Sequence, residues 1–142
     1  MAKLLRLIDA NLNRSLEGLR VCEDVARFVM DDRWLSRRFK SLRHKVGCLA
    51  KKTAAKKAAL LLSRNVKKDV GRKTLYGEKK RKDIKDVFCV NLQRVKESLR
   101  VLEEATKLFD ARVSEGFKKV RFGVYELEKK SRLRLETLLH SG

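Results

Sequence analysis

The chain has 142 residues, of which 43% are hydrophobic and 39% charged, with no proline and only 7 glycines. This length allows one domain with its own core, and so few turn-forming residues exclude a β-sandwich of this size. A formal net charge of +19 favours anionic partners, such as nucleic acid, phosphorylated metabolites or an acidic membrane surface, although a surface rich in Lys, Arg and Glu is also typical of thermophile proteins.

The cysteines and the N-terminal segment indicate where the protein resides. Cys22, Cys48 and Cys89 form no C-x-x-C pair, and an odd number of isolated cysteines is typical of reduced thiols in a cytoplasmic protein. Residues 1–8 are too few and too charged for a signal peptide, and no apolar run approaches the ~18 residues that span a membrane. We therefore expect a cytoplasmic protein with no membrane segment.

Four segments have the apolar periodicity of amphipathic helices. In chain order they cover about residues 9–30, with Asp9 as a candidate N-cap, and then about 35–62, 86–109 and 114–139. The predicted fold class is all-α, and the arrangement expected is a four-helix antiparallel bundle.

The first and third of these helices resemble one another in sequence. Residues 10–28 and 90–108 are identical at eight of 19 positions at a shift of 80, and residues 39–46 match 117–124 more weakly at a shift of 78. The identical pairs of the longer match are Asn11/Asn91, Leu12/Leu92, Arg14/Arg94, Glu17/Glu97, Leu19/Leu99, Arg20/Arg100, Val21/Val101 and Glu23/Glu103. Two such units usually pack about a pseudo-twofold axis. We therefore expect one domain over residues 1–142, made of two duplicated helix pairs (about 9–62 and 86–140) and a linker (about 63–85).

Polar residues interrupt the apolar face of the repeated helix at the same places in both copies. Asn11 lies within the apolar arc and Glu23 at its border, and Asn91 and Glu103 occupy the same angles in the second copy. Buried amides and carboxylates are costly unless they are paired. These residues therefore form either a symmetric polar network, with one arginine from each copy, or a polar cleft between the repeats that receives a ligand.

Arg20 and His44 are further candidates on the first helix pair, and each has a structural alternative. Arg20 belongs to an outward row with Glu17 and Asp24 at helical spacing, which is typical of exposed ion pairs. A lone histidine is more often a structural hydrogen-bonding residue than a catalyst. The counterpart of His44 in the second copy is Phe122, so a role of this histidine belongs to one half only.

The linker is the most basic part of the chain. Residues 51–82 contain 13 Lys or Arg and two acids, so their net charge of +11 is more than half of the total of +19. Long connections in compact domains are more often functional or disordered than merely connecting. A glycine, a hydroxyl group and clustered cations can cradle a phosphate, although the P-loop pattern is absent. The candidate phosphate-binding residues are Arg64, Lys67, Lys68, Gly71, Arg72 and Lys73.

Motifs in both halves of the chain resemble those of a known family. They include Ile8-Asp9-Ala10-Asn11-Leu12-Asn13-Arg14, Glu17-Gly18-Leu19-Arg20-Val21, Leu42-Arg43-His44, Asp69-Val70-Gly71, Asn91 with Arg94, Glu97-Ser98-Leu99-Arg100 and Tyr125-Glu126-Leu127-Glu128-Lys129. In this order, over nearly the whole chain, they resemble the helical domain that precedes thiamine-phosphate synthase in some bacterial proteins. That family has been assigned as a second, non-homologous type of hydroxymethylpyrimidine-phosphate kinase. The resemblance therefore implies ATP-dependent phosphorylation of a pyrimidine phosphate in thiamine biosynthesis.

The resemblance gives the candidate residues roles in such a reaction. Phosphoryl transfer needs cations to offset the charge of the transferred group, and usually Mg²⁺, so the basic linker would bind phosphate while carboxylates act in catalysis or hold Mg²⁺ with ATP. The candidate catalytic residues are Asp69, Glu23 and Glu103. The candidate substrate-binding residues are Asn11, Arg14, Arg20, Arg43, His44, Asn91 and Arg94, of which the two asparagines would read pyrimidine edges. The metal ligands stay open.

This chain departs from the family pattern in two places. Asn65 stands where the family has aspartate after arginine, so a metal-binding or acid–base carboxylate at this position would be lost, and Asp69 is the nearest remaining one. The synthase barrel is not part of the 142 residues, so we expect a stand-alone form.

Two other functions remain open on the sequence alone. A basic helical nucleic-acid-binding protein would explain the net charge, but no recognised motif is present. Only Tyr76 among the aromatic residues lies in the basic segment, so base stacking would be poorly supplied there. A non-catalytic partner of a separately encoded thiamine-phosphate synthase would explain the missing barrel. Self-association as a homodimer is also left open.

Overall fold

Four long helices account for most of the protein. The computed structural model describes residues 1–53, 61–72 and 80–141, and within these ranges the chain forms helices, turns and loops but no strand. The helices are α1 (Ala2–Asp24), which a π-helical turn (Val25–Val29) continues, α2 (Arg33–Thr53), α4 (Ile84–Thr106) and α5 (Ala111–Ser141). The predicted all-α class is therefore confirmed.

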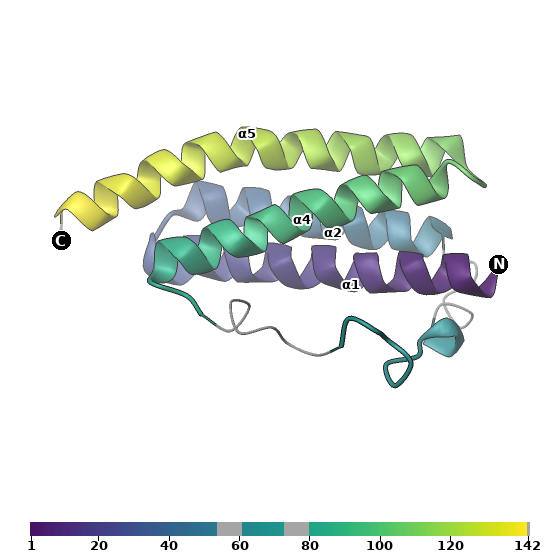
Figure 1. Ribbon diagram of the computed structural model, residues 1–142. Coiled ribbons are helices and arrows are strands. Elements are labelled where there is room, and N and C mark those ends of the chain that lie inside the picture. The colour runs from purple at the N-terminus through teal and green to yellow at the C-terminus, as the bar shows by residue number, and fades with distance from the viewer. Residues whose placement is uncertain (54–60, 73–79, 142) are drawn as a thin grey trace.

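The four helices lie side by side, and neighbouring helices run in opposite directions (Figure 1). α1 contacts α2 and α4, and α5 contacts the same two helices. The end of α5 extends past the turn that joins α1 to α2 (Figure 1). Residues 61–72, a described part of the linker, lie beside α1, on the side away from α5 (Figure 1).

The first helix begins earlier than predicted. α1 starts at Ala2, so Asp9 lies two turns inside the helix, and its prediction as an N-cap is wrong. The apolar periodicity continues upstream of Asp9 through Leu5 and Ile8, which are both buried in the core. Asp9 itself is buried, and its carboxylate is used in a different way, described below.

The end of this helix also differs from a regular α-helix. In the π-helical turn the N–H of Met30 donates to the carbonyl of Val25 at 3.0 Å, five residues earlier. The wider turn changes the direction of the side chains that follow, and here Val29 is 44% exposed while Met30 is buried. α2 is described to Thr53, and the predicted continuation to residue 62 falls partly on residues outside the described ranges.

Aspartates cap the other three helices at their N-termini. Oδ1 of Asp32 accepts a hydrogen bond from the backbone N–H three residues later at 2.9 Å, before α2. Asp83 does the same for α4 at 2.8 Å, and Asp110 accepts from the N–H two residues later at 3.0 Å in α5. Each cap contributes about 1 kcal/mol to stability and fixes where the helix begins.

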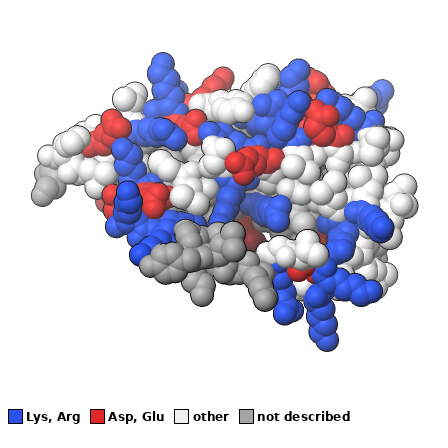
Figure 2. All heavy atoms as spheres, viewed as in Figure 1, with Lys and Arg blue, Asp and Glu red and all other residues white. Residues whose placement is uncertain are grey.

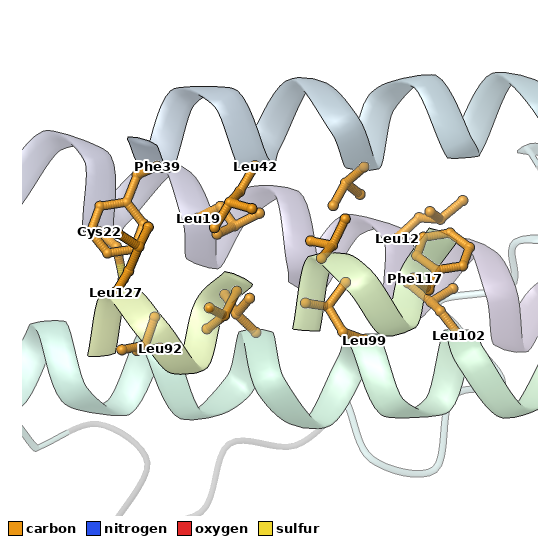
Figure 3. Packing of buried hydrophobic residues seen from close by; sticks show 14 of the residues in the cluster. Leu12, Leu19, Cys22, Phe39, Leu42, Leu92, Leu99, Leu102, Phe117 and Leu127 are labelled. Atoms are coloured by element: carbon orange, nitrogen blue, oxygen red, sulfur yellow. The ribbon is translucent and has the colours of Figure 1, made fainter. Parts of the chain in front are cut away.

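The helices share one hydrophobic core, built from apolar residues at alternating spacings of three and four. On α2 the buried set is Leu35, Phe39, Leu42, Val46 and Leu49, and α1, α4 and α5 have similar spacings. This 3.5-residue repeat is typical of knobs-into-holes packing between helices. Figure 3 shows side chains from all four helices pointing toward one another.

α1 and α4 approach closely at Gly18. A Cβ atom at this position would lie 2.6 Å from Cγ2 of Val95 and 3.0 Å from the carbonyl oxygen of Asn91. Nearby, the hydroxyl oxygens of Ser15 and Ser98 are 2.7 Å apart and share a buried hydrogen bond. The contact between α1 and α4 is therefore tightly packed here.

Replacing Gly18 with alanine is expected to destabilise the protein by about 1–3 kcal/mol, because the methyl group overpacks this contact. Gly47 on α2 is the matched control, since a Cβ there would meet nothing within 4 Å. Gly47→Ala should raise stability by roughly 0.5–1 kcal/mol through the higher helix propensity of alanine. Urea unfolding of both variants checks the prediction, and a Gly18→Ala variant as stable as Gly47→Ala would refute it.

Candidate functional site

Arg64 of the linker is held on α1 by the buried carboxylate of Asp9. Nε of Arg64 donates to Oδ2 at 2.8 Å and Nη2 donates to Oδ1 at 2.9 Å, so the two side chains form a bidentate pair. The Asp9 side chain is only 12% exposed, whereas that of Arg64 is 43% exposed. The hydrogen bonds that Arg64 donates to the Asp9 carboxylate raise the pKa of Arg64. The result is a positionally fixed, solvent-accessible cation beside α1.

The loop that follows Arg64 is shaped by its own polar groups. Nη2 of Arg6 donates to the carbonyl oxygen of Asn65 at 3.0 Å, and Oδ1 of Asn65 accepts from the N–H of Lys68 at 3.1 Å. Oδ1 of Asp69 accepts from the N–H of Gly71 at 2.9 Å. Asn65 thus acts as a hydrogen-bond acceptor in the turn, which an aspartate would also do.

A hollow of about 160 Å³ lies between α1 and the loop that contains Arg64. Its lining includes Arg6, Asp9 and Asn13 of α1 and Arg64, Asn65 and Asp69 of the loop. Typical ligand pockets measure about 300–1,000 Å³, so this hollow suits a phosphate group or a single ring rather than a whole nucleotide. Of the other predicted phosphate-binding residues, Lys67, Lys68, Gly71 and Arg72 are exposed on the same loop, and Lys73 lies outside the described residues.

Glu23 and Glu103 are buried, and each is bound by arginines. Nε of Arg43 donates to Oε2 of Glu23 at 2.8 Å, across the contact between α1 and α2. Nε of Arg121 donates to Oε2 of Glu103 at 2.9 Å, across the contact between α4 and α5. Arg20 and Arg100 add a second, exposed arginine to each carboxylate at 3.7 and 3.1 Å. Glu23 therefore links α1 to α2, and Glu103 links α4 to α5.

The cluster around Glu103 also includes Tyr125. Nη1 of Arg121 donates to the tyrosine hydroxyl at 3.2 Å. Burial alone would lower the pKa of Arg121, but the hydrogen bonds with Glu103 and Tyr125 outweigh it and raise that pKa. The arginine is therefore charged at any physiological pH, and the Glu103 carboxylate keeps its cationic partner.

Asn11 and Asn91 are satisfied within their own helices. Nδ2 of Asn11 donates to the carbonyl of Leu7 at 2.9 Å, and Nδ2 of Asn91 donates to that of Val87 at 2.8 Å. Asn11 is buried on α1, and Asn91 is partly buried on α4, with its backbone carbonyl oxygen facing Gly18. Each asparagine therefore donates to the backbone of its own helix in the same way, four residues back.

The other predicted substrate-binding residues do not meet at the loop. Arg20, Arg43 and His44 together line a hollow of about 710 Å³ on the surface of α1 and α2. Arg14 and Arg94 are exposed on α1 and α4. The structure thus divides the predicted residues into a loop site with Arg64 and Asp69, two Glu–Arg clusters, and exposed arginines near the repeated helices.

Sequence reasoning missed three residues of the loop site, namely Arg6, Asp9 and Asn13. Asp9 and Asn13 are part of the motif in α1, but reading Asp9 as a helix cap removed it from the candidates. Arg6, Asp9 and Asn13 are three and four residues apart, which places them on one face of a helix. This spacing would have identified them once the helix was extended upstream of Asp9. Which linker residue they meet depends on the course of the loop, which has no periodicity.

One face of the described part of the chain has a mixed surface charge (Figure 2). Figure 2 shows Lys and Arg mixed with Asp and Glu over the face that carries α4, α5 and the linker. No group of three or more His, Cys, Asp and Glu side chains suited to a metal ion occurs in the described ranges. Nor does any helix there have the length and apolar character needed to cross a membrane, as predicted.

Comparisons with known proteins agree on one family. The chain matches the model of the ThiD2 family over residues 6–130. It is 37% identical to a thiamine-phosphate synthase of Synechocystis sp. over 124 residues, which cover 87% of this chain and 34% of that protein. A thiamine-phosphate synthase of Thermosynechococcus vestitus is 40% identical over 128 residues, covering 89% of this chain and 35% of the relative. A thiamine-phosphate synthase of Rhodopirellula baltica is 32% identical over 136 residues, which cover 95% of this chain and 36% of that protein.

The chain thus spans about a third of the length of these relatives. No solved structure matches it.

Proposed function

Because the chain belongs to the ThiD2 family, we propose that it acts in thiamine biosynthesis by binding hydroxymethylpyrimidine phosphate at the loop anchored on α1 and phosphorylating it with ATP. The relatives named thiamine-phosphate synthase support the pathway. The observation that carries the proposed site is the bidentate pair between Arg64 and Asp9.

The geometry of Arg64 suits a phosphate ester. A guanidinium group has five N–H donors, and Asp9 accepts two of them, so three remain directed away from the carboxylate. A bound phosphate gains most from a cation that is already fixed, because less side-chain entropy is lost on binding. Lys67, Lys68 and Arg72 on the same exposed loop add positive charge around it.

The substrate's own phosphate, which would accept the phosphoryl group from ATP, suits a site rich in cations. A phosphate monoester has a second pKa of about 6, so at neutral pH it is mostly a dianion. Its oxygen can attack the γ-phosphorus of ATP without a general base, as the bond to the β-phosphate oxygen breaks and ADP leaves. What the reaction needs is alignment and compensation of the negative charge. We therefore assign Arg64 and the loop lysines to the phosphates and give no proton-transfer role to Glu23 or Glu103.

The three candidate catalytic carboxylates are not arranged as a resident metal site. Glu23 and Glu103 are bound by arginines, and Asp69 uses one oxygen for the N–H of Gly71. Mg²⁺ is often held by substrate phosphates and only one or two carboxylates. We therefore propose that Mg²⁺ reaches the site as a complex with ATP, with Asp69 as the nearest protein carboxylate.

The departure at Asn65 is compatible with this proposal. Its side chain accepts from the N–H of Lys68 and its carbonyl accepts from Arg6, so it supports the turn rather than the reacting groups. Loss of a carboxylate here lowers the negative charge beside Arg64, which favours a bound phosphate.

We infer that the two helix pairs arose by duplication and are related by a pseudo-twofold axis within a four-helix bundle. The supporting contacts are equivalent: each asparagine bonds the carbonyl four residues before it, and each glutamate binds an arginine of the next helix. The counterpart of Asp9 in the second copy is Cys89. We therefore expect the loop site to occur on the first copy only, and one substrate per chain.

Partnership with a synthase is part of the proposal. The relatives contain the matched region and about twice as much further chain in one polypeptide. A protein that makes hydroxymethylpyrimidine diphosphate would supply a substrate for such a synthase, whether or not the two are covalently joined.

Turnover tests the kinase part of the proposal. The purified protein is incubated with hydroxymethylpyrimidine phosphate and Mg-ATP, and ³¹P NMR follows the diphosphate product. We expect product with the wild type, none without ATP, and a much lower rate with Arg64→Ala. Specific binding of the substrate with no product would contradict the kinase reaction and leave a ligand-binding domain.

A further inference from the structure

A second basic surface lies between α2 and α5, apart from the Arg64 loop. The two helices form a groove of about 670 Å³, here called the α2–α5 groove, with Leu42, Leu49 and Val120 among its apolar lining. Gly116 and Gly123 of α5 face Leu49 and Leu42 of α2, so the two helices approach closely beneath it. The groove is therefore a surface trough with an apolar floor rather than a closed cavity.

Cations line both walls of this groove. They are Arg37, Arg38, Lys40, Lys45 and Lys52 on α2 and Lys119 on α5. No carboxylate belongs to the described residues that line it. Within the described part of the chain, none of the six forms a salt bridge. This differs from the face in Figure 2, where cations and carboxylates are mixed.

The spread of these cations favours a long anion over a small one. Arg38 and Lys52 lie about four helical turns apart, or roughly 21 Å along α2. A nucleotide or a free phosphate would reach only part of this length, whereas a polymer with regularly spaced phosphates would follow it. Neighbouring helix axes are about 8–10 Å apart, so the groove is narrower than a nucleic-acid duplex and suits a single strand.

An aromatic side chain stands at one end of the groove. Trp34 is 48% exposed, and its ring centroid is 5.7 Å from Cζ of Arg38, which lines the groove, and 4.3 Å from Nζ of Lys130. Proteins that bind single strands combine a basic track with exposed aromatic rings on which bases stack. An acidic peptide would use the cations but would gain nothing specific from a stacking platform.

We propose that the α2–α5 groove binds single-stranded nucleic acid, with the phosphates along the cations of both walls and a base against Trp34. Affinity comes mainly from release of counterions, so binding is strongly salt-dependent and tolerant of sequence. The site is independent of the Arg64 loop, and the proposal goes beyond phosphorylation of a small substrate.

The test uses the full chain and a fluorescein-labelled single-stranded oligouridylate of about 15 nucleotides. Anisotropy measures affinity between about 50 and 200 mM salt. Trp34 is the only tryptophan in the chain, so quenching of its emission reports base stacking in the groove. We expect Lys45→Glu/Lys119→Glu, which reverses one charge on each wall, to lower affinity at least about tenfold and the salt slope by about 1.4.

The matched control is Lys3→Glu/Lys129→Glu, which changes the net charge equally at exposed residues that do not line the groove. Equal losses for both double variants would overturn the proposal, since binding would follow overall charge. No binding by the wild type at about 150 mM salt, equal affinity for polyglutamate, or unchanged Trp34 emission would also overturn it. The groove variant should still bind hydroxymethylpyrimidine phosphate, so failure here and failure of the loop site are distinguishable.

Discussion

Replacing Glu103 with alanine is expected to lower the free energy of unfolding by about 3–5 kcal/mol, because it leaves a largely buried arginine without its carboxylate. The side chains of Glu103 and Arg121 are only 5% and 13% exposed, and Nε and Oε2 lie 2.9 Å apart. The pair joins α4 to α5 beside the core, so its loss affects the whole second helix pair. Urea unfolding monitored by circular dichroism measures the change.

Two further variants distinguish the effect of breaking the Glu103–Arg121 ion pair from the general effect of losing a glutamate. Glu104→Ala removes a neighbouring carboxylate whose side chain is 48% exposed, and it should change stability by no more than about 0.5 kcal/mol. Glu103→Leu/Arg121→Met should recover most of the loss, since apolar residues of similar size often replace a buried ion pair at little cost. A loss below about 1 kcal/mol for Glu103→Ala would show that the pair does not stabilise the fold.

Replacing Arg64 with alanine is expected to weaken binding of hydroxymethylpyrimidine phosphate roughly 10- to 100-fold, the usual effect of losing charge-assisted hydrogen bonds. Arg64→Lys should lose most of this affinity too, because an ammonium group cannot form the bidentate pair with Asp9 and stay fixed. Calorimetric titration measures both affinities. Far-ultraviolet circular dichroism on the same samples checks that α1 is intact despite the unpaired Asp9.

Arg132→Ala is the control for this prediction. Its side chain is 53% exposed, and among the described residues its ion pair is a 3.8 Å contact with Glu128 on its own helix. It removes the same charge as Arg64→Ala, and we expect affinity within about twofold of the wild type, since general charge is screened over about 8–10 Å. An equal loss in both variants would mean that net charge, and not the Arg64 loop, attracts the substrate.

The helices were predictable because their signal is local. The apolar spacing of α2, α4 and α5 determines which residues are buried, and the internal sequence match indicates that Asn11 and Asn91, or Glu23 and Glu103, have equivalent surroundings. Helix ends were less predictable. Asp9 has the residue type of a cap, yet Leu5 and Ile8 extend the apolar stripe upstream and the helix continues through it.

The partners of the polar residues could not be predicted from periodicity. An angle on a helical wheel places Glu23 at the border of the core, but it does not say that Arg43 of the next helix approaches from the other side. The same angle cannot distinguish an asparagine facing a ligand from one that bonds the carbonyl four residues earlier, as Asn11 does. Both outcomes satisfy a buried amide.

The loop site could not be predicted without the three-dimensional path of the loop. Residues 61–72 have no periodic pattern, and the contact between Arg64 and Asp9 spans 55 positions. Charge density identified the loop as a phosphate-binding candidate, while the anchoring residues on α1 came only from the structure. The family motif contained Asp9 and Asn13, but a motif does not by itself say which of its members meet the loop.

Calorimetric titration of the wild-type chain with hydroxymethylpyrimidine phosphate, at about 150 mM salt with and without Mg-ATP, tests the central claim most directly. Because the proposed site is a fixed arginine rather than diffuse charge, we predict saturable binding of one substrate per chain that persists at this ionic strength. Binding absent at this salt, or equal for inorganic phosphate and the pyrimidine phosphate, would contradict the claim that the Arg64 loop is a substrate site.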